Sequence, residues 1–236
     1  MTRVEYRLII PCMDTPPIST GDIVLFSGRG IVSQSIRWRT WSKYSHCGLV
    51  CWVTPEHIRT AASLWSASWI DRTDYLCDWL GCGKWLCFES TTLSDLPCAI
   101  TGEAIHGVQA HELQVRVDRY DGAVCYLPWR ERFRLTEEEQ HNLALRLLVR
   151  IGTPYDARMA ALAGSCLLKY IWPYDAADRS SVFCAAMCGR QIGLLSPGMR
   201  LPLKSPSRWT PGGLYRTTTK TERVDPPVGI QKTKGV

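Results

Sequence analysis

The 236-residue chain has no hydrophobic run long enough to cross a membrane. Its most apolar stretch, 160–172, is interrupted by Lys169 and ended by Pro173, whereas a membrane helix needs about 18 or more apolar residues. The first residues, 1–11, hold a short apolar run without the longer core or the small-residue cleavage site of a secretory signal. We therefore expect a soluble cytoplasmic protein that has no transmembrane segment.

The sequence also lacks the paired Cys-x-x-Cys spacing of structural zinc sites, although it contains eleven cysteines. Cys77, Cys82, Cys87 and Cys98 cluster along the chain without that spacing. The odd number of cysteines, and their scatter through apolar segments, favour reduced thiols over a disulfide scaffold. We expect no metal site and no cofactor.

The sequence also has no recognisable nucleic-acid module in which basic residues are interleaved with aromatics. The formal net charge is +6, and much of the surplus falls in the last stretch of the chain. We expect no nucleic-acid partner and interpret 216–236 as a polar, mobile tail. The whole chain has 45% hydrophobic and 21% charged residues, an ordinary globular composition, and we expect 1–215 to form one domain.

Short apolar runs bounded by turn residues predict several strands, separated by helical segments. A capping box of Thr136 and Glu139 predicts one helix that ends near Gly152. The tryptophan-rich segment 57–84 has no clear period, so we treat it as an insertion of unknown structure. The expected strands are 23–26, 45–53, 85–91, 114–119 and 123–127, with a hairpin turn at 121–122, and the further expected helices are 31–41, 157–171 and 182–195.

Cys184 has the position of a nucleophile. With Ser181 as the N-cap, it falls in the first turn of the helix that runs to Leu195. The unpaired N–H groups and the dipole of a helix start favour an anion, so they would stabilise a thiolate. The same groups could bind the oxyanion that forms when a thiolate adds to a carbonyl. Cys188, one turn later, lacks this setting and is interpreted as a core residue.

Two further residues could complete a catalytic triad with Cys184. His46 opens the strand 45–53, where its imidazole could act as the base. Glu89 lies on the apolar strand 85–91, and a carboxylate in such a strand needs a partner. It is the best candidate to orient the histidine. Taken one at a time, each of these residues could equally be structural.

The order and surroundings of these residues resemble the circularly permuted NlpC-type papain-like hydrolases, the YiiX-like group of bacteria and their phages. The similarity covers most of the chain, and Ala185 and Ala186 depart from it where the family has Ser and Glu. The similar segments are Gly21-Asp22-Ile23-Val24-Leu25-Phe26, Tyr44-Ser45-His46-Cys47-Gly48-Leu49-Val50, Phe88-Glu89-Ser90-Thr91, Gly152-Thr153-Pro154-Tyr155-Asp156, Phe183-Cys184-Ala185-Ala186-Met187 and Thr210-Pro211.

The resemblance implies an α+β fold, with a small antiparallel sheet packed against helices, in which histidine precedes cysteine along the chain. It implies a thiol hydrolase in which Cys184 attacks, His46 is the base and Glu89 orients it, with Tyr44 and Ser45 near the substrate. The expected substrate is a peptide or a peptidoglycan stem-peptide linkage. An acyltransferase or lipid thiolesterase acting on an acyl substrate remains an alternative. A second alternative is a non-catalytic binding protein or a virion-associated component that is encoded by a phage.

Overall fold

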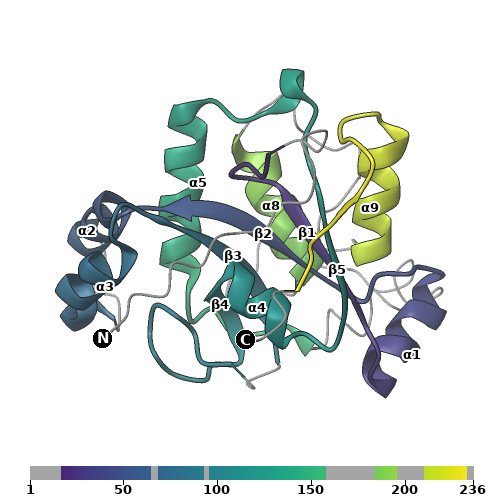
Figure 1. Cartoon of the computed structure of the whole chain (residues 1–236), viewed down its shortest axis with the longest axis horizontal. Coiled ribbons are helices and arrows are strands. Elements are labelled where there is room, and N and C mark those ends of the chain that lie inside the picture. Colours follow the sequence, from purple (N-terminus) through teal and green to yellow (C-terminus); the bar gives the residue numbers. More distant parts are fainter. Residues whose placement is uncertain (1–16, 65–68, 93–95, 158–183, 196–209, 233–236) are drawn as a thin grey trace.

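The computed structural model describes residues 17–64, 69–92, 96–157, 184–195 and 210–232. Its centre is a six-stranded sheet in which every neighbouring pair is antiparallel, in the order β4-β3-β2-β1-β5-β6 (Figure 1). The mixed composition of helices and one small antiparallel sheet matches the fold class expected from the sequence. The strands are β1 (Ile23–Gly28), β2 (His46–Val53), β3 (Lys84–Thr91), β4 (Gly107–Glu112), β5 (Gly122–Leu127) and β6 (Val228–Gly229).

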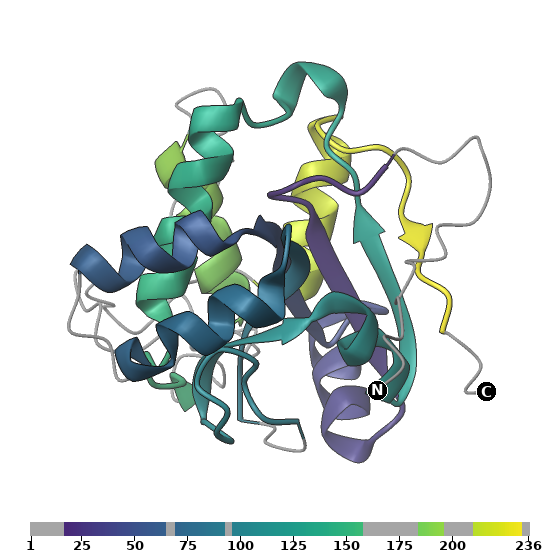
Figure 2. The ribbon, with the colours of Figure 1, turned by 60° about the vertical axis from the view of Figure 1, so that its left-hand side comes forward.

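Helices cover the sheet unequally. The larger core packs one face against α2, α3, α5 and α8, with α9 alongside, while α4 covers part of the other face (Figures 1 and 2). Two short 3₁₀ turns, Ile70–Arg72 and Glu131–Phe133, join elements. The helices are α1 (Ile31–Thr40), α2 (Pro55–Leu64), α3 (Thr73–Leu80), α4 (Leu113–Arg119), α5 (Glu137–Arg150), α8 (Cys184–Leu195) and α9 (Pro211–Lys220).

Alternation along β2 divides its side chains between the two cores, because successive residues of a strand point to opposite faces. Cys47, Leu49 and Cys51 lie in the larger core beneath α5 and α8. Val50 lies in the smaller core with residues of α4. His46 shares the parity of Val50, so it begins the strand on the face that α4 covers.

Most of the predicted elements are confirmed. The strands expected at 23–26, 45–53, 85–91 and 123–127 correspond to β1, β2, β3 and β5, and the helix expected at 31–41 is α1. The capping box of α5 is present, since the Thr136 hydroxyl accepts from the Glu139 N–H and the Glu139 carboxylate accepts from the Thr136 N–H. Helix α8 lies within the helix expected at 182–195, whereas the expected Ser181 cap and the helix 157–171 lie outside the described residues.

The strand predicted at 114–119 is wrong, because these residues form α4. Val115 and Val117 alternate with polar residues, which suggested a strand. However, the buried apolar residues Leu113 and Val117 are spaced four apart, as on a helix face. The turn at 121–122 therefore connects α4 to β5 rather than two paired strands, and β5 pairs with β1 and β6.

Two segments for which the sequence predicted no element contain regular structure. The segment 57–84, interpreted as an insertion of unknown structure, forms most of α2 and all of α3, and it contributes Ile58 and Leu76 to the larger core. The segment 216–236, interpreted as a polar tail, forms the end of α9 and then β6, as far as residue 232. Thr218 is fully buried, and its hydroxyl donates back to carbonyls of the same helix, so a threonine-rich stretch still packs.

Candidate active site

Glu89 is a fully buried carboxylate in the middle of the sheet. Arg116 of α4 binds it with two hydrogen bonds, Nε to Oε1 at 2.5 Å and Nη2 to Oε2 at 3.1 Å. Burial alone would raise the pKa of Glu89. The charge of Arg116 and the hydrogen bond from His46 outweigh burial and hold this pKa well below its usual range. Glu89 is therefore a carboxylate at neutral pH.

The His46 ring lies against this carboxylate. Its Nε2 is 2.6 Å from the Glu89 Oε2, and the Phe26 ring lies 5.4 Å away, between ring centres, on the neighbouring strand. Burial alone would lower the pKa of His46. The negative charge and hydrogen bond of Cys184, and then those of Glu89, raise this pKa to about 10. His46 is thus an imidazolium at neutral pH, and its Nδ1 is the nitrogen left for the sulfur.

Cys184 is the first described residue of α8 and is only 5% exposed. Hydrogen bonds from the Cys47 thiol, the charge and hydrogen bond of His46, and the Cys47 backbone N–H lower its pKa well below the ordinary thiol value, against the opposing effect of burial. The pKa of Cys47 itself is raised well above its usual value by burial and by its cysteine neighbours. Cys47 therefore stays a thiol and donates to the Cys184 thiolate. Cys188, also buried, donates to the Cys47 sulfur at 3.9 Å.

Four charges alternate in sign through this site: the Cys184 thiolate, the His46 imidazolium, the Glu89 carboxylate and the Arg116 guanidinium. Their sum is zero, which lets the group stay out of water at a tolerable cost, because each charge has an opposite neighbour. A further buried ring, His111, lies with its Nε2 3.4 Å from the Glu89 Oε1. The structure thus brings together the three residues predicted as catalytic.

Sequence reasoning missed several of the groups around these residues. Arg116 could be found only by recognising α4 as a helix. Residues three apart on a helix share a face, so Arg116 then lies on the buried face of Leu113. Cys47 lies in the segment that carries His46, but its alternation pointed only to a core residue. Tyr155 lies in one of the segments that resemble the family, but the sequence suggested no role for its side chain. The pKa of its hydroxyl is raised by burial and by the negative charge of Cys184, so it lies near the sulfur.

Tyr44 and Ser45, predicted to lie near the substrate, are both buried and have partners within the protein. The Tyr44 hydroxyl accepts from the Cys125 thiol at 3.4 Å, and the Tyr44 ring packs edge-on against Tyr215. The Ser45 hydroxyl donates to the Phe26 carbonyl at 3.3 Å. These contacts hold β2 against β1, β5 and α9, and they give both side chains structural roles.

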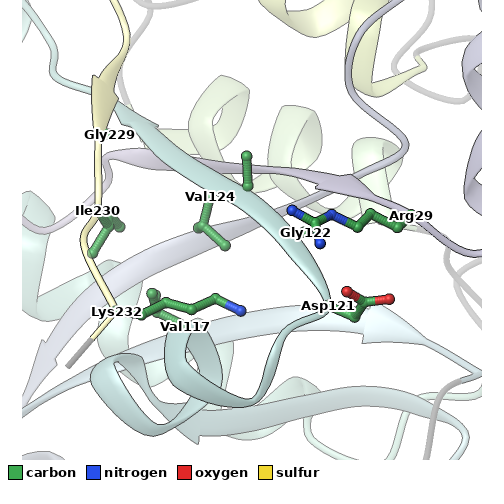
Figure 3. Close-up of a pocket in the computed structure, with 9 residues that line it drawn as sticks. Arg29, Val117, Asp121, Gly122, Val124, Gly229, Ile230 and Lys232 are labelled. Atoms are coloured by element: carbon green, nitrogen blue, oxygen red, sulfur yellow. The ribbon is translucent and has the colours of Figure 1, made fainter. Parts of the chain in front are cut away.

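A separate hollow of about 450 Å³ lies between α4, β5 and β6 (Figure 3). Val117 and Val124 line it, and Arg29, Asp121 and Lys232 stand around it. The Lys232 amine donates to the backbone carbonyl of Tyr120. Neither His46, Glu89 nor Cys184 lines this hollow, so it is distinct from the candidate active site.

The four cysteines that cluster in the sequence separate in space. Cys77 and Cys98 belong to the larger core and Cys87 to the smaller one, on the other face of the sheet, while Cys82 is exposed. Among the described residues, no group of three or more His, Cys, Asp or Glu side chains is arranged to hold a metal ion.

No protein-family model matches the chain, and no curated protein matches it. Among solved structures, the chain is similar to the metalloprotein yiiX from Escherichia coli O157:H7, of the family designated DUF1105. The two share 17% sequence identity, and their superposition gives a TM-score of 0.46 over 89% of this chain and 88% of the other.

Proposed function

We propose that the protein is a cysteine-nucleophile hydrolase that cleaves an amide bond in a peptide or a peptidoglycan stem peptide, with a circularly permuted papain-like arrangement. One observation carries the proposal. A buried cysteine of α8, with a lowered pKa, faces a histidine that lies 2.6 Å from a buried carboxylate on its other side. A structural cysteine would gain nothing from this setting, which stabilises its charged form.

In the proposed reaction, the Cys184 thiolate attacks the scissile carbonyl carbon and forms a tetrahedral intermediate. The unpaired N–H groups of the first turn of α8 would stabilise its oxyanion. The His46 imidazolium then gives a proton to the leaving amine, and the thioester forms. Neutral His46 next takes a proton from water, which attacks the thioester and releases the acid and the thiolate.

Glu89 and Arg116 act on His46 rather than on the substrate. The Glu89 carboxylate accepts from Nε2, which fixes the ring orientation and leaves Nδ1 to exchange its proton with the sulfur and the leaving group. Arg116 keeps Glu89 ionised and fixes its two oxygens. The chain order of histidine, glutamate and cysteine supports the permuted arrangement, since it reverses the cysteine-first order of ordinary papain-like enzymes.

The test pairs the wild type with Cys184→Ser and, as a matched control, Cys188→Ser, which removes another buried thiol one turn away. Each protein is incubated with peptidoglycan fragments, with peptides and with phospholipids, and the products are identified by mass spectrometry. An activated ester acylates the nucleophilic thiol, and intact-protein mass spectrometry detects the resulting thioester. We expect amide cleavage and a thioester in the wild type and in Cys188→Ser, and neither in Cys184→Ser.

The possible outcomes separate the alternatives. Release of fatty acid, or its transfer to an acceptor, would keep the thiol chemistry but replace the amide hydrolase with an acyltransferase or lipid thiolesterase. A wild type that forms no thioester and cleaves no substrate would contradict the proposal and leave a non-catalytic binding or virion component. Equal activity in Cys184→Ser would exclude Cys184 as the nucleophile.

A further inference from the structure

Helix α1 turns most of its apolar side chains outward. Its inward side carries Ser33, Ile36, Arg37 and Thr40, all partly buried, and none of its residues is fully buried. Four of the six large apolar side chains that are exposed in the described part of the chain belong to α1 and its C-cap: Ile31 at 83%, Val32 at 73%, Trp38 at 77% and Trp41 at 84%. We call these four residues the α1 apolar face.

This orientation is fixed by contacts on the inward side. Arg37 donates to the Ser27 hydroxyl at 3.1 Å, from α1 to β1. Arg216 of α9 donates to the carbonyls of Thr40 and Trp41 at the C-terminus of the helix. Figures 1 and 2 show α1 at one end of the sheet, beside the ends of β1 and β5. The apolar side chains therefore point outward because the polar ones are anchored.

Trp41 adds a second observation. Its φ of 48° places a non-glycine residue in the left-handed region, at a helix end where glycine or asparagine is preferred. Its side chain is 84% exposed, so packing against the described residues does not compensate for the backbone cost. A tryptophan that is exposed and also in an unfavourable backbone conformation indicates a contact outside the chain.

Positive charge predominates at the C-terminal end of the α1 apolar face. No acidic residue occurs between Asp22 and Glu56, and Arg39 and Lys43 are exposed there, while Arg29 at the other end of the helix lies beside the exposed Asp121. Exposed tryptophans beside exposed cations are typical of a helix that lies at a lipid–water interface, where the rings enter the headgroup region and the cations meet anionic headgroups. A protein partner would need complementary acidic side chains, and a second copy of this face would bring like charges together.

We propose that the α1 apolar face binds the surface of an anionic lipid membrane. Within the described residues no helix is long and apolar enough to cross a membrane, so this contact would be peripheral. Trp38 and Trp41 enter the headgroup layer, and Arg39 and Lys43 pair with lipid phosphates. The proposal does not depend on catalysis by Cys184.

The test uses the full chain and sedimentation with vesicles of phosphatidylcholine, alone or mixed with phosphatidylglycerol. We expect binding to the mixed vesicles that weakens as salt rises, and little binding to phosphatidylcholine alone. Trp38→Ser with Trp41→Ser should weaken binding at least about tenfold, and Arg39→Gln with Lys43→Gln should remove most of its salt dependence. The matched control is Tyr75→Ser on α3, which removes an aromatic ring that is 58% exposed beside Arg72 and should leave binding unchanged.

Trp41→Gly separates folding from binding. Glycine suits the left-handed conformation, so this variant should melt at the same temperature or higher while binding vesicles more weakly. Equal vesicle binding by the wild type and the double tryptophan variant would overturn the proposal, as would an equal loss in Tyr75→Ser. Concentration-dependent dimerisation that the tryptophan variants abolish would also overturn it, and would assign the face to a second copy. Cys184→Ser should bind vesicles like the wild type, so this result is independent of activity.

Discussion

Gly48 of β2 lies directly opposite Glu89 of β3 in the antiparallel ladder. His46 lies two residues before Gly48 on the same face, so it is the diagonal neighbour of Glu89. A Cβ atom at position 48 would come within 2.7 Å of the Phe88 carbonyl oxygen, 2.9 Å of the Cys87 sulfur and 3.4 Å of the Glu89 Cβ. The absence of a side chain at Gly48 is what leaves room for the Glu89 carboxylate to lean toward His46.

Gly48→Ala should therefore disturb the site through the backbone. We expect a loss of about 1 to 3 kcal/mol in the free energy of unfolding, because the Phe88 carbonyl cannot give way without moving β3. Proteolytic or esterase activity should fall with it. Gly229→Ala on the edge strand β6 is the matched control, since a Cβ added there would meet nothing within 4 Å and stability should hardly change. A Gly48→Ala protein as stable as the control would contradict this explanation.

Glu89→Gln should destabilise the protein as well as slow its reaction. The substitution leaves the buried Arg116 charge without its partner, which costs about 3 to 5 kcal/mol when one member of a buried pair is removed. Adding Arg116→Met should recover part of that loss without restoring activity. Chemical denaturation of the single and double variants measures the coupling. Glu112→Gln, which breaks the more exposed pair with Lys84, should cost no more than about 1 kcal/mol.

Alkylation of Cys184 should lower the pKa of His46 below about 10. A capped sulfur carries no negative charge, so burial, which disfavours the imidazolium, is opposed only by Glu89. An NMR titration of the His46 ring before and after treatment with iodoacetamide measures the change. The direction matters for the proposed mechanism, because a thioester would likewise uncharge the sulfur and free His46 to act as a base. An unchanged pKa would show that the charge of Cys184 does not reach the ring.

Cys184 should react with iodoacetamide at neutral pH faster than the other thiols. Burial raises the pKa of Cys47, Cys51 and Cys87, which keeps them protonated as well as hidden. Cys82 is exposed and serves as the control for simple access. Peptide mapping over time, in wild type and His46→Ala, gives the rates. Slower labelling of Cys184 in His46→Ala would show that the imidazole contributes to activation, whereas uniform labelling in the wild type would refute an activated thiolate.

The buried carboxyl group of Asp22 should make the free energy of unfolding fall as pH rises from about 4 to 7. Burial raises its pKa to about 7, even though the N–H groups of Ser19 and Trp129 and the charge of Arg134 oppose this. The folded state therefore holds a proton that the unfolded chain loses near pH 4, so unfolding is favoured as pH increases through this window. Denaturation across it should show a slope in the wild type that Asp22→Asn lacks. The same slope in both proteins would rule out Asp22 as its source.

Local patterns predicted β1, β2, β3, β5 and α5, because short apolar runs and a capping box act over a few residues, but they did not predict β4 or β6. The pairing of His46 with Glu89 was also predictable, since both lie on adjacent apolar strands where a polar group needs a partner. Arg116 was not predictable from local pattern. Its helix, α4, is short and its valines alternate, so only the packing of Leu113 and Val117 against the sheet distinguishes it from a strand.

The helices α2, α3 and α9 were missed for a related reason. In 57–84, tryptophans and charged residues obscure the helical period, and the core contacts of Ile58 and Leu76 depend on strands far along the chain. In α9, threonines weaken the local preference for helix, yet Thr210 caps its start by accepting from the Gly213 N–H. Tertiary packing, rather than propensity, decides both segments.

The sheet order places β2 and β3 in its interior, each hydrogen-bonded on both sides. Glu89 is held by ladders on both sides, opposite Gly48 and Gln109, whereas His46 at the start of β2 is paired with Phe26 of β1. Amide protons of these strands should exchange with solvent in the slowest class, with an opening free energy equal to that of global unfolding. The backbone that positions the two side chains then opens by cooperative unfolding rather than by local breathing.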